Sequence, residues 1–264
     1  MHKFENSWLS QREKIDNLSK NISIINKINR VLKNYDEIRI IDLGTGTGSN
    51  FRYLSKKIKY KNQSWTLMDL SKSSLNEAKK NLVINNKIKK IILKHDDIIK
   101  NIQQHTFTDY DLVTGSAFLD IMPLDWFKKF YKLNMNTKLV YFSINYDGYF
   151  KFYPKHNLDR DVLELFNHDQ KSKKNNKTKA VGPDCSDIID SCFSKTHKCY
   201  LFKSNWTNVK NKKFQLMFLD FCEKIIKKNR KTDLLEWLIF RKDNIINNKS
   251  KLSVSNKDFL AIKI

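Results

Sequence analysis

The segment Ile38–Asn50, which reads IRIIDLGTGTGSN, carries Gly44, Gly46 and Gly48 at alternate positions. Its apolar first half is typical of a buried central strand, and a helical pattern begins at Asn50. Glycine lets the backbone turn sharply and leaves no Cβ between the main chain and a ligand. A strand, a glycine turn and a helix N-terminus together form a place where a nucleotide-like ligand can lie against bare backbone.

The spacing of the glycines separates the known nucleotide-binding motifs. The dinucleotide fingerprint GxGxxG needs a further glycine where this chain has Ser49 or, read from Gly46, Phe51. The P-loop is excluded because no Gly-Lys-Ser/Thr follows. The pattern acidic-x-Gly-x-Gly-x-Gly, which begins at Asp42, resembles that of the class I S-adenosylmethionine (SAM) dependent methyltransferases. A glycine turn in another kind of α/β protein is the alternative.

The resemblance implies that SAM is the cofactor. In that family the glycine turn lies beside the methionine part of SAM, and the acidic residue acts near its amino group, directly or through water. The cofactor-binding residues expected in this segment are Asp42, Gly44, Thr45, Gly46, Gly48 and Asn50.

A second carboxylate, Asp69, stands 21 positions after Gly48, at the end of the next predicted strand, 64–70. A carboxylate at this place can accept hydrogen bonds from both hydroxyls of a ribose. The resemblance implies that Asp69 binds the SAM ribose and that Leu70 flanks the adenine. An Asp69 that only caps the following helix, 72–81, is the alternative.

The next two predicted strands complete the expected cofactor site. After strand 90–93, the resemblance places Asp97 at the adenine amino group and Ile98 as its apolar flank. Strand 110–115 leads to Ser116, which we expect to face the sulfonium because ligands bind beyond the carboxyl ends of parallel strands. Nucleic-acid adenine methyltransferases carry Asn/Asp-Pro-Pro-Tyr/Phe at this point. The chain reads TGSA instead, which argues against that class.

Candidate substrate-binding residues lie on both sides of this core. Residues 4–34 are predicted to be helical, with Trp8 and Arg12 on one face. In many small-molecule members of the resembled family such a helix closes over the pocket. Arg12 would then meet a carboxylate of the ligand or substrate, or it is an ordinary surface residue. In the long stretch after the predicted fifth strand, 138–145, the candidates are Tyr146, Arg160, Asn167 and His168.

His168 is also the candidate catalytic base, because imidazole titrates near neutrality. A base is needed only for an acceptor that is protonated at working pH, such as a hydroxyl or an ammonium. An inert histidine in a basic loop is the alternative. Residues 171–179 (KSKKNNKTK) are expected to form a lysine-rich surface loop.

The composition indicates which kinds of partner the protein is expected to bind. The formal charge is +22, but only seven of the 50 basic residues are Arg, and Asn and Ile are abundant beside Lys. We interpret this as a base-composition bias, so a nucleic-acid partner is not expected. The four cysteines show no CxxC pair and no histidine spacing typical of a metal site, so neither a metal site nor a disulfide framework is expected. No apolar run could span a membrane, and the N-terminus is too polar for a signal peptide, so a cytoplasmic protein is expected.

The predicted fold is α/β, with a Rossmann-like seven-stranded, mostly parallel sheet, an antiparallel last strand (252–264), helices on both faces, an N-terminal helix and a helical insertion. Within a single overall domain we expect four parts, in chain order an N-terminal helical cap, a SAM-binding core, a substrate-covering insertion and the rest of the core with a helical insertion. Their ranges are 1–36, 37–145, 146–183 and 184–264.

The predicted function is methyl transfer from SAM to oxygen or nitrogen of a small-molecule acceptor. Two alternatives stay open. One is methylation of RNA or protein, which the positive charge would favour. The other is a SAM-binding regulatory protein that has lost catalysis. The sequence determines neither the acceptor nor the oligomeric state.

Overall fold

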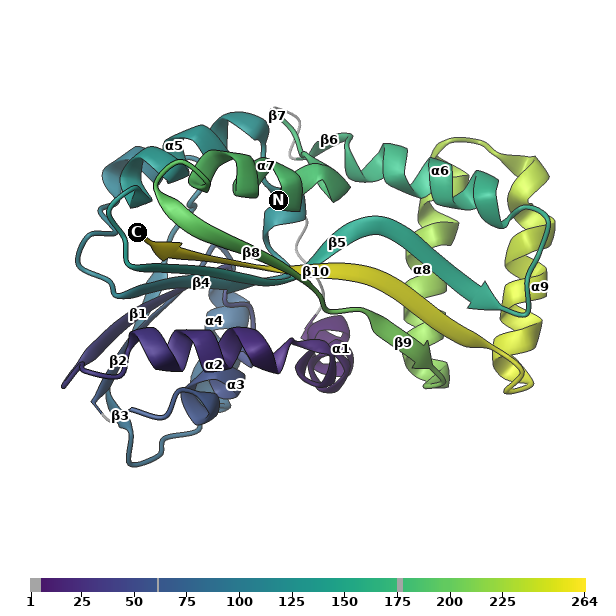
Figure 1. Ribbon diagram of the computed structural model, residues 1–264. Helices are drawn as coiled ribbons and strands as arrows, with labels where there is room; N and C mark the ends of the chain where they lie inside the picture. The colour runs from purple at the N-terminus through teal and green to yellow at the C-terminus, as the bar shows by residue number, and fades with distance from the viewer. Residues whose placement is uncertain (1–5, 61, 175–177) are drawn as a thin grey trace.

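The computed structural model describes residues 6–60, 62–174 and 178–264, and over these residues the chain builds an eight-stranded mixed sheet. The strand order is β3-β2-β1-β4-β5-β10-β8, with β9 paired to β10 (Figure 1). Strands β1 to β5 run parallel where they pair, and β10 runs antiparallel to its neighbours. The predicted Rossmann-like, mostly parallel sheet with an antiparallel last strand is confirmed.

The parallel half of the sheet positions the glycine turn. Strand β1 lies between β2 and β4, and every residue of β1 except Arg39 is buried. The carboxyl ends of these strands therefore meet at one edge of the sheet. The parallel strands before β5 are β1 (Ile38–Leu43), β2 (Gln63–Asp69), β3 (Ile88–His95) and β4 (Leu112–Ser116).

The other half of the sheet projects beyond the parallel strands. The predicted fifth strand ended at Asn145, but β5 continues to Tyr153 because β10 supplies hydrogen-bonding partners as far as the pair Lys251 and Tyr153. The first residues of the expected insertion 146–183 therefore belong to the sheet. A short strand, β9, was not predicted. These strands are β5 (Leu139–Tyr153), β8 (His197–Lys203), β9 (Trp206–Val209) and β10 (Lys251–Lys263).

Helices cover both faces of the sheet, as predicted. One face packs α5 and α7 over Val113, Val140 and Phe142. The opposite face packs α2 and α3 over Ile40 and Tyr141. The helices that flank the parallel strands are α2 (Ile22–Val31), α3 (Ser49–Lys57), α4 (Lys72–Lys80), α5 (Leu124–Asn134) and α7 (Cys185–Phe193).

A third apolar cluster belongs to the projecting part of β5 and β10. There Phe150 and Phe152 pack against Phe218 of α8 and Trp237 of α9, and Phe166 of α6 joins them. Figure 1 shows these helices at the far end of the molecule from β3, with α1 seen end-on between the two halves. Their bounds are α6 (Asp159–Gln170), α8 (Lys212–Lys228) and α9 (Leu235–Ile246).

The N-terminal segment differs from the single helical stretch predicted for 4–34. It forms α1 (Asn6–Ser19) and α2, with a break at Lys20 and Asn21. The break has a local cause, because the Asn21 side chain accepts a hydrogen bond from Ser23 N (2.9 Å) and so caps α2. The first residues of the predicted segment, and residues 175–177 of the predicted surface loop, lie outside the described residues. The described ends of that loop pair as β6 (Lys173–Lys174) and β7 (Thr178–Lys179).

No helix in the described part of the chain is both long and apolar enough to cross a membrane.

Candidate active site

The glycine turn follows β1 and has the strained backbone that its sequence predicts. Gly44, Gly46 and Gly48 adopt φ values of +62°, +55° and +83°, which L side chains rarely adopt. A Cβ at Gly44 would lie 2.4 Å from the Phe118 ring, so no other residue fits there. The Thr45 N–H donates to Met68 O of β2 (2.9 Å), which fixes the turn beside the end of that strand.

Asp69 points toward the glycine turn. Its Oδ2 accepts a hydrogen bond from Gly46 N (2.8 Å), and its Oδ1 accepts one from Ser71 N (2.8 Å). The cap of α4 is Ser71, whose Oγ accepts from Ser74 N. Burial raises the pKa of Asp69, and the bonds from Ser71 and Gly46 oppose that rise. A carboxylate and a bare main chain therefore face the same space.

Asp42 lies behind this space. It is fully buried, its Oδ2 accepts from the Thr45 hydroxyl (2.6 Å), and its Oδ1 accepts from Asn50 Nδ2 (2.8 Å). Burial raises the pKa of Asp42 to about 6. Asp42 was predicted to act near the cofactor, but it does not line the cavity, and both of its oxygens face Thr45 and Asn50. Its observed contacts orient Thr45 and Asn50.

A cavity of about 370 Å³ opens between the glycine turn and Asp69. Gly48 is not among its lining residues, in contrast to the prediction, because this glycine precedes α3 and faces Arg52 and Ala78. Seven of the predicted cofactor residues line the cavity, namely Gly44, Thr45, Gly46, Asn50, Asp69, Leu70 and Ser116. Residues that were not predicted also line it, among them Leu9, Arg12, Asp16, Ser71, His95 and Phe118.

The end of β3 differs from its predicted role. Ile98 is 5% exposed and packs in the core, and its place at a cavity is taken by Ile99. Asp97 lines the neighbouring, larger cavity, and its Oδ1 accepts from Ile99 N (3.1 Å). His95 lines the first cavity, with its Nε2 at 2.9 Å from Leu70 O. The two residues expected at the adenine therefore lie elsewhere, Asp97 at the larger cavity and Ile98 in the core.

A second cavity of about 1460 Å³ adjoins the first. Arg12, Leu70, Ala117 and Ile121 line both cavities, so the two spaces meet at these residues. The wall of the second cavity includes residues of α1, α5, β5, α6, β9, α8 and β10, and much of it is aromatic. Its aromatic lining residues are Trp8, Trp126, Tyr146, Phe166, Trp206, Phe218 and Phe221.

Three of the predicted substrate residues line this second cavity: Trp8, Arg12 and Tyr146. Arg12 is held in place, because its Nε donates to Asp16 Oδ2 (2.8 Å) and its guanidinium lies over the Trp206 ring at 5.1 Å. The Trp206 Nε1 also donates to Asp16 (2.9 Å). These contacts join helix α1 to β9 beside Arg12, one of the residues at which the two cavities meet.

The other predicted substrate residues lie outside both cavities. Asn167 positions Tyr146, since its Oδ1 accepts from the tyrosine hydroxyl (2.8 Å). Arg160 has 86% of its side chain exposed and pairs with Glu164 on the surface. His168 is exposed on α6, two residues after the buried Phe166 and so about 200° round the helix from it. The structure therefore places Arg160 and His168 on the surface of α6 and does not bring either side chain to the predicted substrate site.

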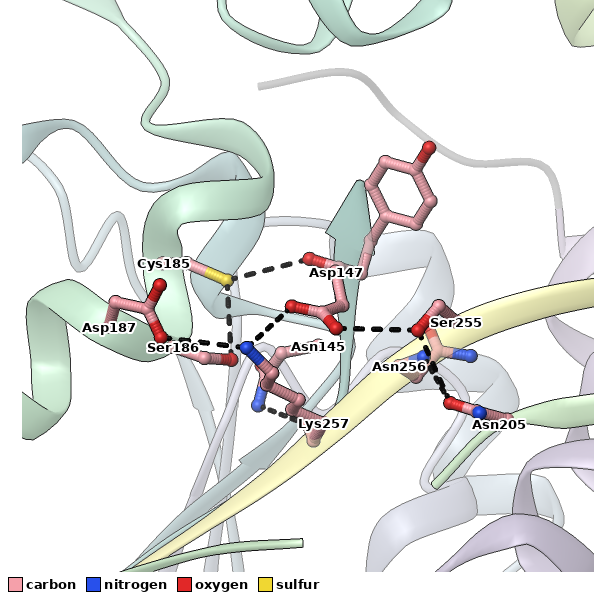
Figure 2. A network of polar contacts seen from close by, with 10 residues as sticks. Asn145, Asp147, Cys185, Ser186, Asp187, Asn205, Ser255, Asn256 and Lys257 are labelled. Atoms are coloured by element: carbon pink, nitrogen blue, oxygen red, sulfur yellow. Dashed lines mark hydrogen bonds and ion pairs between the residues drawn. The ribbon is translucent and has the colours of Figure 1, made fainter. Parts of the chain in front are cut away.

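A polar network supports the second cavity where the β5–β10 ladder changes register (Figure 2). The Lys257 ammonium lies 2.8 Å from Asp147 of β5 and 3.5 Å from Asp187 of α7. The hydrogen bond to Asp147 raises the pKa of Lys257. Asn256, which lines the cavity, donates its N–H to Asn205 Oδ1 (2.9 Å). These contacts fix the two strands to each other and to α7.

The fold and this site define a class. A mostly parallel Rossmann-like sheet, a glycine turn after its first strand and a carboxylate after the second form the nucleoside-binding edge of a class I methyltransferase. The cavity fits such a cofactor, because the turn presents bare main chain and a Cβ at Gly46 would reach within 3.2 Å of Leu9 across it.

Comparison with known families agrees with this class. Residues 40–134 match the family model described as a methyltransferase domain. The match is consistent with an enzyme of the class I SAM-dependent methyltransferase type, whose cofactor is SAM. A comparison with curated proteins found no match.

Solved structures share the fold. A cyclopropane-fatty-acyl-phospholipid synthase-like protein from Lactobacillus casei is similar with a TM-score of 0.57 and 8% identity, covering 96% of this chain and 92% of its own. The YcgJ protein from Bacillus subtilis is similar with a TM-score of 0.51 and 12% identity, covering 92% of this chain and 99% of its own.

Proposed function

We propose that this protein transfers the methyl group of SAM to an oxygen or nitrogen atom of a small, predominantly apolar molecule bound in the second cavity. The observation that carries this proposal is the junction of the two cavities at Arg12, Leu70, Ala117 and Ile121. An acceptor in one cavity reaches a donor in the other only through such a junction.

The residues around the first cavity would hold the cofactor. The main chain at Gly44 and Gly46 and the Asp69 carboxylate bind it, Leu70 flanks it, and Ser116 lies toward the junction. SAM supplies an activated methyl group. When bound, it would give this methyl group to an acceptor oxygen or nitrogen as the carbon–sulfur bond broke, with S-adenosylhomocysteine as the leaving group and loss of one proton from a protonated acceptor. The protein contributes mainly by holding the acceptor in line at about 3 Å and by excluding water.

The second cavity favours a bulky apolar acceptor. Its volume of about 1460 Å³ exceeds the roughly 300–1,000 Å³ of ordinary small-molecule pockets. Its deep wall includes Trp8, Trp206 and Phe218, each no more than 5% exposed. The burial of apolar ligand surface against such a wall is the main source of binding free energy.

The charges at the edge of this cavity are largely paired with one another. Lys228 lies 2.6 Å from Asp169, and Lys129 lies 2.9 Å from Asp125. Lysines with carboxylate partners are weak sites for a polyanion, which agrees with the expectation that the acceptor is not a nucleic acid.

The positions of the two cavities suggest a role for each part of the chain. We assign residues 1–36 as the cap, 37–145 as the cofactor-binding core, and the helices inserted in 146–183 and 184–264 as the cover of the acceptor.

A labelling experiment tests the proposal. The purified protein is incubated with methyl-labelled SAM and a cell extract, and products are separated into apolar, polar, RNA and protein fractions. We expect label in the apolar small-molecule fraction. Label confined to RNA or protein would support the alternative acceptors, and saturable S-adenosylhomocysteine binding without any labelled product would support a catalytically inactive protein.

A variant pair links the label to the second cavity. Leu216→Glu places a charge on the α8 face that lines this cavity, and we expect labelling to fall about tenfold with unchanged S-adenosylhomocysteine affinity. The matched control is Ile239→Glu on α9, where the native side chain is 71% exposed and lies outside both cavities. Equal labelling by both variants would contradict the assignment of the acceptor site.

A further inference from the structure

Two adjacent residues in the break between α1 and α2 connect the cap to the sheet. Lys20 is 6% exposed, and its Nζ donates to Asn50 Oδ1 (3.0 Å). The N–H of the next residue, Asn21, donates to Asp258 Oδ2 (3.0 Å). Asn50 lines the cofactor cavity, so the first of these bonds reaches the cofactor site directly.

The second bond leads to the acceptor cavity through Asp258. This residue is fully buried on β10, at a register shift between Lys257 and Phe259. Its Oδ1 accepts a hydrogen bond from Ile144 N (2.8 Å). Ile144 lines the acceptor cavity and has a φ of +55°. A β-branched residue adopts this left-handed conformation only where its surroundings impose it.

The charges in this region depend on one another. Burial lowers the pKa of Lys20, and the carboxylates of Asp16, Asp258 and Asp42 act against that decrease. Burial likewise raises the pKa of Asp258, and the bonds from Asn21 and Ile144 oppose that rise. The removal of one charge leaves the others buried with less compensation.

We propose that Lys20 and Asp258 are positioning residues that hold the cap, the cofactor cavity and the acceptor wall as one unit. Lys20 fixes Asn50 beside the cofactor, while Asp258 fixes Ile144 beside the acceptor and holds the cap through Asn21. The acceptor part of this inference rests on the proposed function.

Calorimetric titration with S-adenosylhomocysteine tests the cofactor side without any acceptor. We expect Lys20→Met to weaken binding about fivefold and Asp258→Asn about threefold, because each releases one tie between the cap and the sheet. The matched control is Lys27→Met on α2, whose native ammonium lies over the Tyr200 ring at 4.1 Å, outside both cavities. Wild-type affinity in both folded test variants would overturn the inference.

A double-variant cycle tests the acceptor side. In Asp258→Asn a single side-chain oxygen remains to accept hydrogen bonds from both Ile144 N and Asn21 N, so the support of the Ile144 backbone weakens, and we expect methyl transfer to fall about tenfold. In an Ile144→Gly background the same change should cost about twofold or less, because glycine adopts the left-handed conformation unaided.

The cycle separates positioning from general destabilisation. A merely structural role for Asp258 predicts the same loss in both backgrounds, and that result would overturn the acceptor side of the inference. If the wild-type protein binds S-adenosylhomocysteine but labels no acceptor, the proposed function fails, and the calorimetric titration still decides whether Lys20 and Asp258 position the cofactor site.

Discussion

The cofactor cavity of about 370 Å³ is lined largely by short segments near Gly44 and Asp69, whereas the acceptor cavity of about 1460 Å³ draws on residues from Trp8 to Asn256. The first presents main chain and one carboxylate to its ligand space. The second presents aromatic and aliphatic side chains from helices and strands throughout the chain.

This difference separates two ways of building a site. A backbone cradle requires particular conformations at a few positions, so few residue types fit those positions and its geometry is local. An apolar cavity requires only that side chains from several elements converge, so many sequences suffice. Changes in the first region should therefore act on cofactor affinity, and changes in the second on acceptor binding and stability.

The largest expected effect is on the stability of the acceptor half. Phe218 is 5% exposed, and its ring stacks on Phe166 with centroids 5.8 Å apart. We expect Phe218→Ala to lower the free energy of unfolding by about 3 kcal/mol, measured by chemical denaturation. S-adenosylhomocysteine affinity should stay within about twofold under native conditions. A large loss of affinity would show that the two regions are not separable in this way.

Slightly smaller is the expected effect of a side chain in the glycine turn. Gly46→Val puts a β-branched residue at a φ of +55° with its Cβ 3.2 Å from Leu9. We expect S-adenosylhomocysteine binding to weaken about hundredfold in calorimetry. The matched control is Gly182→Ala, at a φ of +59° outside the cofactor cavity, which should lose stability but keep its affinity.

The two neighbouring carboxylates provide a sharper contrast. We expect Asp69→Ala to weaken S-adenosylhomocysteine binding about 30-fold, because it removes a charged acceptor and leaves Gly46 N without its partner. Asp97→Ala should change that affinity by about threefold or less, since Asp97 lines the acceptor cavity. Equal losses would restore the original prediction that Asp97 binds the cofactor.

The smallest expected effect is a pH dependence from Asp42. Its pKa is raised to about 6, so acidification through that value protonates it and removes an acceptor from Thr45 or Asn50. We expect S-adenosylhomocysteine affinity to fall about threefold between about pH 7.5 and pH 5, and Asp42→Asn to show less pH dependence. Because Asp69 and His95 line the same cavity, the difference between the two proteins is the informative quantity.

The stability contribution of Asp42 has the opposite sign. Its pKa in the folded protein, about 6, lies above its ordinary value of 3.8, so the folded state binds the proton more tightly. The contribution of this group to stability is therefore fully present below pH 3.8 and is lost as pH rises through about 6. Denaturation of the wild-type protein and of Asp42→Asn over this range would measure it.

The contrast between the two regions also explains what could be predicted from the sequence. The glycine turn and Asp69 were located correctly in the chain because their spacing and the parallel sheet bring them together. Gly48 and Ile98 were predicted to contact the cofactor, but neither residue reaches a cavity. Gly48 lies at the start of α3, and Ile98 is in the core, while its neighbour Ile99 lines the second cavity. A motif defines which segment carries a site but not the direction of each side chain in it.

The acceptor region was harder to predict because its contacts are distant in the chain. The extension of β5 depends on pairing with β10 about 100 residues later, and no local pattern announces it. His168 was chosen for its chemistry, although the phase of α6, set by Phe166, turns it outward. Leu216 and Phe221 lie on a helix that was predicted, but no motif assigns that helix to a cavity.

The most direct test is a crystal structure of the protein with S-adenosylhomocysteine. We expect the ligand between Gly46 and Asp69, with its sulfur directed toward the junction at Ala117 and Ile121. A ligand bound elsewhere, or one whose sulfur faces away from the acceptor cavity, would contradict this expectation.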